Sequence, residues 1–360
     1  MFLMNAWYCA GWDYEIHQGK GAIVARKIAG ERVVLYRTPS SGKVIAFEDR
    51  CPHRQAALSL GRKEGDSLRC MYHGMKFNSD GICEEIPGQT IIPERACVRS
   101  YPVVEKDNWV WVWMGDPAKA DPNLICFSVG PGDPNWHIKT SKMHVQTSYR
   151  WEIENLADLS HLTWVHEKTV GGDPAYSSIR PIHVITQRGI DSTFWVRSVA
   201  PTAIVAHLFP DGMKLDICFQ VHQTVPCNWV MHFRAFSAGT NTEGESNGKL
   251  IVDSWTCQAV TPCDEDSVDY YYSWGASKET EIPGLSDLLG GALDDAFAED
   301  QRMLEAQHVR RKERPDMKLI SIAHDAGPGK MLWVLDKLIQ EERQSQQVGR
   351  SQPVAESASA

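Results

Sequence analysis

Apolar and polar residues alternate along short segments in the first third of the chain, and this alternation is typical of β-strands. The clearest case is residues 108–114, which read N-W-V-W-V-W-M and place three Trp at a period of two. These Trp could be platforms for a ligand, but one packed face of a sheet explains them more simply. Three earlier strands, separated by turns, are expected at residues 22–28, 32–37 and 43–47.

The rest of the chain mixes strand patterns with helical ones. Helices are expected at residues 151–166 and, towards the end of the chain, near 285–311 and 329–343. The strand candidates lie at residues 143–149, 178–186, 192–199, 214–221, 229–236, 249–259 and 268–274. The pattern therefore predicts an α+β fold that is all-β at first and mixed afterwards.

A segment rich in proline and glycine separates these two parts. Asp116-Pro117 and the segment from Asp121 to Pro134 together contain four Pro and two Gly, which indicates a linker. We expect one domain at residues 1–125, with the linker reaching about residue 135, and a second at 136–343. The polar tail, residues 344–360, is rich in Ser and Gln and is expected to be disordered.

Charge and composition narrow the classes of partner. The chain has 37 basic and 46 acidic residues, a net charge of −9, and no basic tract longer than Arg310-Arg311-Lys312, which argues against nucleic acid. No stretch reaches the roughly eighteen apolar residues that a spanning helix needs, so we expect a soluble, cytoplasmic protein with no membrane contact. The ten cysteines are scattered, and most are expected to be buried, reduced thiols.

Two short motifs each bring one Cys and one His together. Cys51-Pro52-His53-Arg54 is followed by Cys70-Met71-Tyr72-His73-Gly74, so the pattern is C-x-H and then C-x2-H. Two thiolates and two imidazoles suit a [2Fe–2S] cluster in which both His bind the same iron, the Rieske arrangement. A structural zinc site is the alternative, but zinc fingers usually pair Cys with Cys and His with His. The pattern therefore favours the cluster.

A second concentration of candidate ligands lies at residues 155–166, where Asn155, Asp158, His161 and His166 stand among apolar residues. Neutral imidazole is the commonest metal ligand in proteins, so two His this close suggest a transition metal. On a regular helix, however, residues five apart point about 140° away from each other. Either the helix ends or kinks between the two His, or they do not share a metal. A helix with satisfied polar residues fits the stretch equally well.

A carboxylate stands on the apolar stripe of the helix expected near 285–311. Asp300 lies three residues after Phe297 and four before Leu304. Because an unpaired buried charge is costly, Asp300 needs a partner. A ferrous ion and an Arg elsewhere in the chain would both serve, and the pattern alone does not separate them.

These motifs resemble those of Rieske non-haem iron oxygenases, and in particular the oxygenase components of the vanillate O-demethylase type, which include dicamba O-demethylase and toluenesulfonate methyl-monooxygenase. The similarity covers nearly the whole chain and includes N-A-W-Y at 5–8, E-I-P-G-Q at 85–89, Y-P-V-V-E at 101–105 and W-M-G-D-P at 113–117. The resemblance implies an N-terminal all-β Rieske [2Fe–2S] domain, with Cys51, His53, Cys70 and His73 as ligands. A helix-grip catalytic domain, in which helices grip an antiparallel sheet, would follow it.

The resemblance also implies the ligands of a mononuclear Fe(II). The F-A-E-D-Q segment at 297–301 matches the family's third-ligand segment and selects Asp300 over Asp294, Asp295 and Glu299. His161, His166 and Asp300 would then form a two-His-one-carboxylate facial triad, since the family's helix is irregular between its two His.

Two further residues of the same stretch match family positions. Asp158 matches the family's bridging acid, which would hydrogen-bond His161 and contact His73 of a neighbouring subunit in a homotrimer. Asn155 matches a position beside the iron, as a weak ligand or as a donor behind the ligands.

The implied function is that of the terminal oxygenase in a multicomponent Rieske monooxygenase. The chain has no G-x-G-x-x-G turn and no C-x4-C-x2-C motif, so its electrons would come from a separate NAD(P)H-dependent reductase or ferredoxin. With O2, the enzyme would oxidise an aryl methyl, methoxy or N-alkyl group of a small aromatic substrate. The alternatives are a Rieske electron carrier without oxygenase activity and a ring cis-dihydroxylating dioxygenase. The sequence does not rank the pocket candidates Phe219, His222, Trp229, His232 and Trp255.

Overall fold

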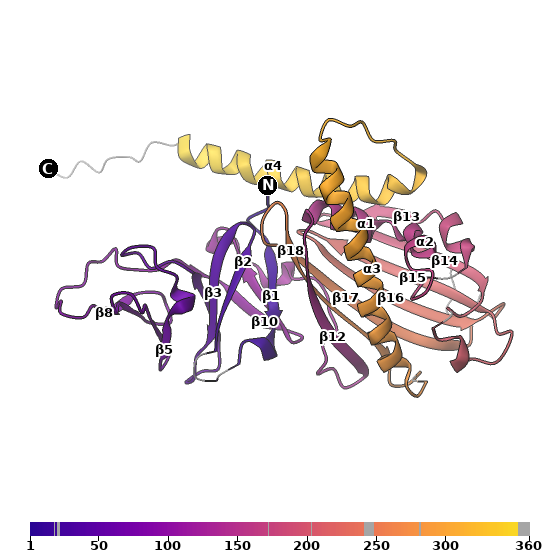
Figure 1. Ribbon diagram of the computed structural model, residues 1–360, viewed down its shortest axis with the longest axis horizontal. Helices are drawn as coiled ribbons and strands as arrows, with labels where there is room; N and C mark the ends of the chain where they lie inside the picture. The colour runs from indigo at the N-terminus through magenta and orange to yellow at the C-terminus, as the bar shows by residue number, and fades with distance from the viewer. Residues whose placement is uncertain are drawn as a thin grey trace.

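The computed structural model describes residues 1–17, 19, 22–171, 173–202, 204–240, 248–280 and 282–351. Three small antiparallel sheets make up its N-terminal part, at the left of Figure 1. In spatial order, the first holds β1 (Trp7–Trp12), β11 (Trp109–Trp113) and β10 (Val103–Lys106). The second holds β2 (Ile23–Ile28), β3 (Glu31–Arg37), β4 (Val44–Glu48) and β9 (Ser100–Tyr101). The third holds β5 (Arg62–Glu64), β6 (Ser67–Arg69), β7 (Lys76–Phe77) and β8 (Cys83–Glu85).

The strands predicted for this part are confirmed. The predictions for β2, β3 and β4 each lie within one residue of the observed bounds. β1 was not predicted. All six of its residues are buried, and a strand that is covered on both faces lacks the alternation of apolar and polar positions that identifies a strand.

The Trp-rich strand β11 is buried on both faces. Its three Trp lie in one apolar cluster with Ile138 and Tyr271 of the C-terminal part, whereas Val110 and Val112 belong to another cluster. The three Trp therefore form one packed face, as predicted, and they join the two parts of the chain. Between the end of β11 and Trp136 the fully described chain contains only short 3-10 turns. The division into domains near residues 125–135 stays a prediction.

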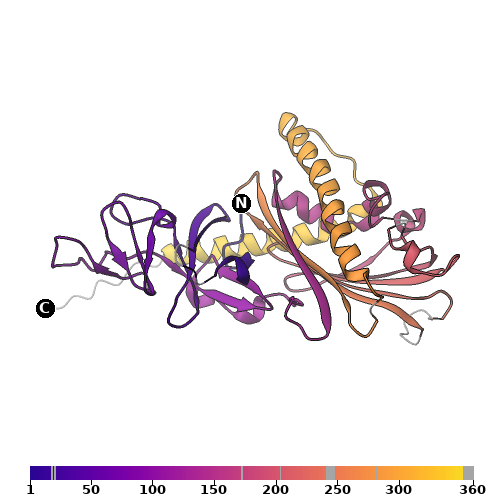
Figure 2. The same cartoon turned by 60° about the horizontal axis from the view of Figure 1, so that its bottom comes forward.

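A seven-stranded antiparallel sheet forms the C-terminal part (Figures 1 and 2). Its strands, in spatial order, are β12 (Trp136–Val145), β18 (Val268–Ser277), β17 (Leu250–Pro262), β16 (Asn228–Ser237), β15 (Leu215–Thr224), β14 (Gly189–Val199) and β13 (Ile182–Ile185). The strand predicted at 143–149 is wrong in its bounds, because β12 begins seven residues earlier and the chain is already helical at Tyr149.

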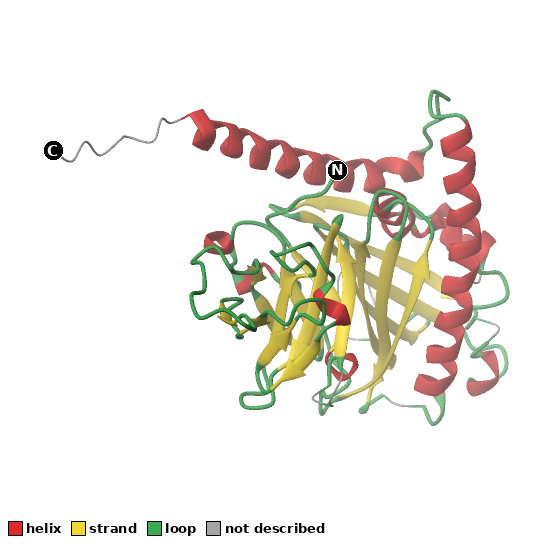
Figure 3. Ribbon diagram, turned by 60° about the vertical axis from the view of Figure 1, so that its left-hand side comes forward, coloured by secondary structure: helices red, strands yellow, loops and turns green. Residues whose placement is uncertain are grey.

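The α-helices that the structure describes lie on and beside this sheet (Figure 3). They are α1 (Tyr149–Ala157), α2 (Leu162–Val165), α3 (Leu285–Glu313) and α4 (Ala326–Ser351). α3 packs on β12 and β18, and α4 packs on α1, β13 and β14. The prediction of a single helix at 151–166 is wrong, because the helix is interrupted at Asp158, between α1 and α2.

α4 also reaches the N-terminus of the chain. The backbone N–H groups of Met4 and Asn5 donate to the two carboxylate oxygens of Glu342, at 2.9 and 2.6 Å. This contact lies near the end predicted for the helix, and α4 continues to Ser351, eight residues into the tail that we expected to be disordered. Residues 352–360 lie outside the described residues.

Two predictions from composition can be compared with the fold. None of the ten cysteines forms a disulfide, and eight of them are buried, as predicted for most of them, while Cys97 is exposed and Cys126 half-buried. None of the helices that the structure describes carries an apolar stretch long enough to span a bilayer.

Candidate functional site

The two Cys-His motifs fold into equivalent turns. In the first, Cys51 N–H donates to Ala56 O at 2.8 Å, and in the second, Cys70 N–H donates to Met75 O at 2.8 Å. The fourth residue after each Cys, Gln55 or Gly74, donates its N–H back to the carbonyl of that Cys. Both fourth residues have positive φ, 59° at Gln55 and 77° at Gly74, so the two loops share one backbone conformation.

The two turns bring the four predicted cluster ligands together as one pair of Cys and one pair of His. Cys51 and Cys70 are buried, and burial together with a hydrogen bond to the Cys70 thiol raises the pKa of Cys51 to about 11. His53 and His73 are exposed, and their ring centroids lie 4.5 Å apart. One pair of thiols and one pair of imidazoles is the donor set of a Rieske [2Fe–2S] cluster, in which each pair binds one iron. The residues present therefore fit this cofactor.

A break in the helix at Asp158 precedes the two other His. Asp158 ends α1 in an extended conformation, and its carboxylate accepts a hydrogen bond from Ser160 N–H at 2.9 Å, which starts a 3-10 turn. His161 and His166 then flank the single turn of α2, one at each end. The irregularity that the resemblance implied between the two His is wrong in its position, because the helix is interrupted before His161, at Asp158.

His161, His166 and Asp300 come together as the resemblance implied. Nε2 of His166 lies 3.2 Å from Asp300 Oδ2, and Nε2 of His161 lies 3.7 Å from Asp300 Oδ1. One ligand atom from each residue lies within 4.8 Å of the other two. Two imidazoles and one carboxylate on one side of a site leave positions open for O2, which is the donor set of non-haem Fe(II) oxygenases. These residues fit a mononuclear iron.

Two hydrogen bonds behind this group involve residues that the sequence did not single out for a role. Glu299 Oε2 accepts from His166 Nδ1 at 3.0 Å and from Thr169 Oγ1 at 2.7 Å. Burial lowers the pKa of His166, but the hydrogen bonds and negative charges of Asp300 and Glu299 outweigh it, so that the pKa is raised. A carboxylate on Nδ1 fixes the ring and leaves Nε2 for a metal. No signal in the sequence indicates this role, because F-A-E-D-Q served only to prefer Asp300.

Asn155 and Asp158 lie beside the same group, but Asp158 acts differently from the prediction. Asn155 Nδ2 donates to Asp300 Oδ1 at 3.2 Å, so Asn155 orients the carboxylate. His161 Nδ1 lies 2.5 Å from the backbone carbonyl of Asp158, whereas the Asp158 carboxylate bonds Ser160. The predicted carboxylate–His161 hydrogen bond is therefore wrong for this structure, since the capping turn directs the side chain away from the ring.

Glu152 is a second carboxyl that the sequence analysis missed. It lies on α1, one turn before Asn155, and only 2% of it is exposed. Burial, followed by the negative charge of Asp300, raises its pKa to about 8. Glu152 is therefore a neutral acid near pH 7 in the metal-free protein.

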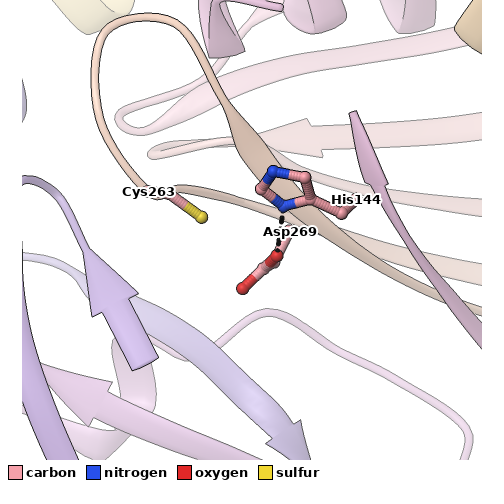
Figure 4. A group of neighbouring side chains, drawn as sticks. All are labelled: His144, Cys263 and Asp269. Atoms are coloured by element: carbon pink, nitrogen blue, oxygen red, sulfur yellow. Dashed lines mark hydrogen bonds and ion pairs between the residues drawn. The ribbon is translucent and has the colours of Figure 1, made fainter. Parts of the chain in front are cut away.

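His144, Cys263 and Asp269 form another group of metal-type side chains (Figure 4). His144 Nδ1 lies 2.8 Å from Asp269 Oδ1, and burial together with Asp269 raises the pKa of the Cys263 thiol to about 12. Beside them, the β2–β3 turn meets the β17–β18 loop, where Gly30 N–H donates to Cys263 O at 3.0 Å. As it stands, the group is a His–Asp contact and a protonated thiol at the junction of the two parts of the chain.

A cavity of about 160 Å³ lies between the large sheet, α3 and the α1–α2 segment. His161, His166, Asp300 and Asn155 line it at one side, and most of its other walls are apolar. Of the pocket candidates from the sequence, Phe219 and Trp229 line the cavity, whereas His222, His232 and Trp255 do not. An apolar cavity bordered by a group of metal-type side chains is the expected form of a substrate site.

Comparisons with known proteins agree with this arrangement. Residues 6–102 match the Rieske [2Fe-2S] domain, and residues 145–341 match the Vanillate O-demethylase oxygenase C-terminal domain. The chain is 36% identical over 348 residues to the toluene-4-sulfonate monooxygenase system iron-sulfur subunit of Comamonas testosteroni, covering 95% of this chain and 98% of the relative. It is 32% identical over 360 residues to the vanillate O-demethylase oxygenase subunit of Pseudomonas sp. strain HR199, covering 96% and 97%.

A solved structure extends the likeness to three dimensions. Dicamba monooxygenase bound to 3,6-dichlorosalicylic acid superposes with a TM-score of 0.85 at 27% identity, over 95% of this chain and 99% of that one. Another structure of dicamba monooxygenase contains non-haem iron. An N-terminal Rieske domain, a catalytic domain built on a large antiparallel sheet and the two sets of metal-type side chains occur together here. The chain therefore belongs to the Rieske non-haem iron oxygenases, in the family of vanillate O-demethylase oxygenase components.

Proposed function

We propose that the protein is the terminal oxygenase of a multicomponent Rieske monooxygenase, which uses O2 to oxidise a methyl, methoxy or N-alkyl group of a small aromatic substrate. The observation that carries this proposal is the cavity lined by His161, His166 and Asp300, in the same chain as the cluster loops. A Rieske electron carrier would need the cluster loops alone. Ring cis-dihydroxylation has less support, because the named relatives are monooxygenases and demethylases.

The proposed reaction balances as follows for a methoxyarene. One O2, two electrons and two protons enter. One oxygen atom joins the methyl carbon and the other leaves as water. The hydroxylated carbon then leaves as formaldehyde when its C–O bond to the ring oxygen breaks, and the ring oxygen takes the hydroxyl proton to give the phenol. The electrons come from a separate reductase or ferredoxin.

The chain's own residues hold and orient the reacting groups. We propose that Cys51, His53, Cys70 and His73 bind the cluster, and that His161, His166 and Asp300 bind the iron. When bound, the cluster supplies single electrons and the iron activates O2. Asn155 holds the Asp300 carboxylate and Glu299 holds the His166 ring, so that both ligands keep their orientation. The apolar walls of the cavity exclude water from the reacting carbon.

The placement of the two metal sites supports a homotrimer in which one subunit's cluster serves its neighbour's iron. In Figure 1, β5 and β8 of the cluster region and α2 of the iron region lie at opposite ends of the chain. Both ends expose large apolar side chains: Met71 and Tyr72 in the second cluster loop and Trp164 on α2, the last 72% exposed. A head-to-tail contact between two such ends closes into a ring when the rotation fits. In that ring, Asp158 would lie between His161 and the neighbour's His73.

Metal analysis and turnover test the proposed function. An oxygenase should hold roughly three irons per chain and a carrier roughly two. Asp300→Ala should lose one iron and all product while keeping the cluster spectrum. Asp295→Ala, at an exposed position of the same helix, is the matched control and should keep both. Formaldehyde release from methoxyarenes with a surrogate reductase measures product. Two irons in the wild-type protein, or full activity in Asp300→Ala, would contradict the proposal.

A further inference from the structure

We infer that the cavity selects an uncharged, apolar substrate with about one aromatic ring, and that it rejects arenes carrying a carboxylate or a sulfonate. This inference rests on the proposed function and names the substrate class of that site. It differs from the toluene-4-sulfonate and vanillate that the names of two relatives give as their substrates. A cavity of about 150 Å³ is enough for benzene in another protein, and this one is similar in size, about 160 Å³.

The alternation of side chains along β16 gives the first reason for this inference. Trp229, Met231, Phe233 and Ala235 line the cavity from alternate positions of this strand. Successive side chains on a strand point to opposite faces, so Arg234 belongs to the outer face. Its guanidinium donates there to Gln220 Oε1 at 2.8 Å. The strand therefore turns its cation away from the substrate.

The neighbouring strands repeat this pattern. On β15, Leu215, Ile217 and Phe219 line the cavity, whereas Asp216 does not. On β14, Arg197 lies 3.5 Å from Asp216 and stacks on the ring of Trp195, and neither residue lines the cavity. The charged side chains of these three strands therefore lie on the face of the sheet opposite the iron site.

No Lys or Arg occurs among the described residues that line the cavity. The undescribed positions between residues 136 and 347 contain no Lys or Arg in the sequence either. Of the ionisable residues that line the cavity, His161, His166 and Asp300 are the proposed metal ligands, and the fourth, Tyr176, is a phenol whose pKa is raised by burial. An anionic substituent that reaches the apolar walls would therefore be buried without a counterion, which is strongly unfavourable.

Two neutral donors among the lining residues do not replace a cation. The indole N–H groups of Trp229 and Trp274 are buried and have no hydrogen-bond partner. Trp229 pairs in register with Gln258 of β17, and Trp274 pairs with Thr256 from the other side of that strand. β17 lies between the two strands that carry these donors, and a neutral N–H does not supply the counterion that a buried carboxylate needs. Each could serve a neutral acceptor such as an ether or carbonyl oxygen.

The inference is tested by binding, separately from turnover. The probes are 4-methylanisole and 4-methoxybenzoate, which share a methoxy group and differ in a methyl against a carboxylate. We expect the iron-loaded protein to bind 4-methylanisole at least about 100-fold more tightly, measured by calorimetry and by quenching of Trp fluorescence. Equal or tighter binding of 4-methoxybenzoate, or binding of neither probe, would overturn the inference.

A charge added on the inner face should change the preference. Met231→Arg places a cation in the cavity wall, and we expect it to bind 4-methoxybenzoate at least about tenfold more tightly than the wild type does. Phe233→Lys makes the same test in case Met231→Arg does not fold, as judged by circular dichroism. His222→Arg is the matched control, since it adds a cation on the outer, exposed face of β15 beside Asp191. An equal gain in His222→Arg would overturn the role of the cavity wall.

Failure of this inference is distinguishable from failure of the proposed function. Formaldehyde from 4-methoxybenzoate at a rate equal to that from 4-methylanisole would overturn the inference and leave the oxygenase assignment intact. Selective binding of 4-methylanisole in a protein that holds two irons per chain would overturn the oxygenase assignment and support the apolar site.

Discussion

Glu299 and His166 form a contact that determines how the second His can bind a metal. Oε2 of Glu299 accepts from Nδ1 of the ring at 3.0 Å, while Nε2 on the other edge lies 3.2 Å from Asp300 Oδ2. The imidazole is therefore held between two carboxylates from consecutive residues of α3. With its proton on Nδ1, the ring keeps a lone pair on Nε2 for the iron.

This contact predicts that Glu299→Ala weakens iron binding without removing a ligand. The His166 ring would lose the partner of Nδ1, and such losses typically cost ~10–100-fold in metal affinity. We expect a lower iron content after dialysis against a chelator, together with an unchanged Rieske spectrum. Asp295→Ala controls for a general effect on α3, because Asp295 is exposed. Iron retention equal to that of the wild type would contradict a role for Glu299.

The sequence could predict the features of this molecule that depend on local pattern. β15 and β16 were expected at 214–221 and 229–236 and lie at Leu215–Thr224 and Asn228–Ser237, since alternation over several residues identifies a strand. Each proposed metal ligand was predicted from a short motif made of residues that are close to it in the sequence. The pairing of thiols with thiols and imidazoles with imidazoles, however, follows from the meeting of two loops, which only the fold brings together.

Other features depend on tertiary contacts and could not be predicted. Consecutive residues of a helix point about 100° apart, so the pattern gave no reason to place both Glu299 and Asp300 on one ring. Both carboxylates contact the His166 ring because each lies beside a different nitrogen, Glu299 at Nδ1 and Asp300 at Nε2. The helix break at Asp158 could be located only once the Ser160 hydrogen bond was known. The face of β16 that lines the cavity could be identified only once the position of α3 was known.

The two cluster loops predict a specific sensitivity at Gly74. Its φ of +77° is costly for other residues, and a Cβ there would lie 2.7 Å from Pro87 Cγ. Gly74→Ala should destabilise the loop by roughly 1–3 kcal/mol and shorten the half-life of the Rieske absorbance on warming. Gly65→Ala is the control, since Gly65 has a φ of +62° but no atom within 4 Å of the added Cβ. Equal half-lives in the two variants would show that the Pro87 contact is unimportant.

Glu152 predicts a pH dependence of stability in the metal-free protein. Its folded-state pKa is about 8, raised by burial and by Asp300, whereas the ordinary value is 4.5. Between these pH values the folded state holds a proton that the unfolded state has lost, so the free energy of unfolding falls as pH rises. The total loss is up to roughly 5 kcal/mol and is complete above pH 8.

Glu152→Gln should remove this loss, because the amide does not titrate. We expect urea midpoints for the variant that change less between pH 5 and pH 8 than those of the wild type. Glu154→Gln is the control on the same helix, since Glu154 is only half-buried and pairs with Arg311 at 2.8 Å. A wild-type pH profile in Glu152→Gln would show that another group carries the dependence.

Asp158 allows electron transfer to be separated from metal binding. Its carbonyl accepts from His161 and its carboxylate caps the next turn through Ser160, and Asp158→Asn can keep both bonds because an amide oxygen also accepts. The change then removes only the charge that we propose to lie opposite a neighbour's His73. We expect near-normal cluster and iron contents, with turnover and cluster reoxidation slowed by ~10–100-fold when pre-reduced protein is mixed with substrate and O2. Asp173→Asn makes the same change at another capping residue, where the carboxylate accepts from Ala175 N–H at 2.9 Å, and should react at the wild-type rate. Reoxidation of Asp158→Asn at that rate would leave Asp158 with its capping role alone.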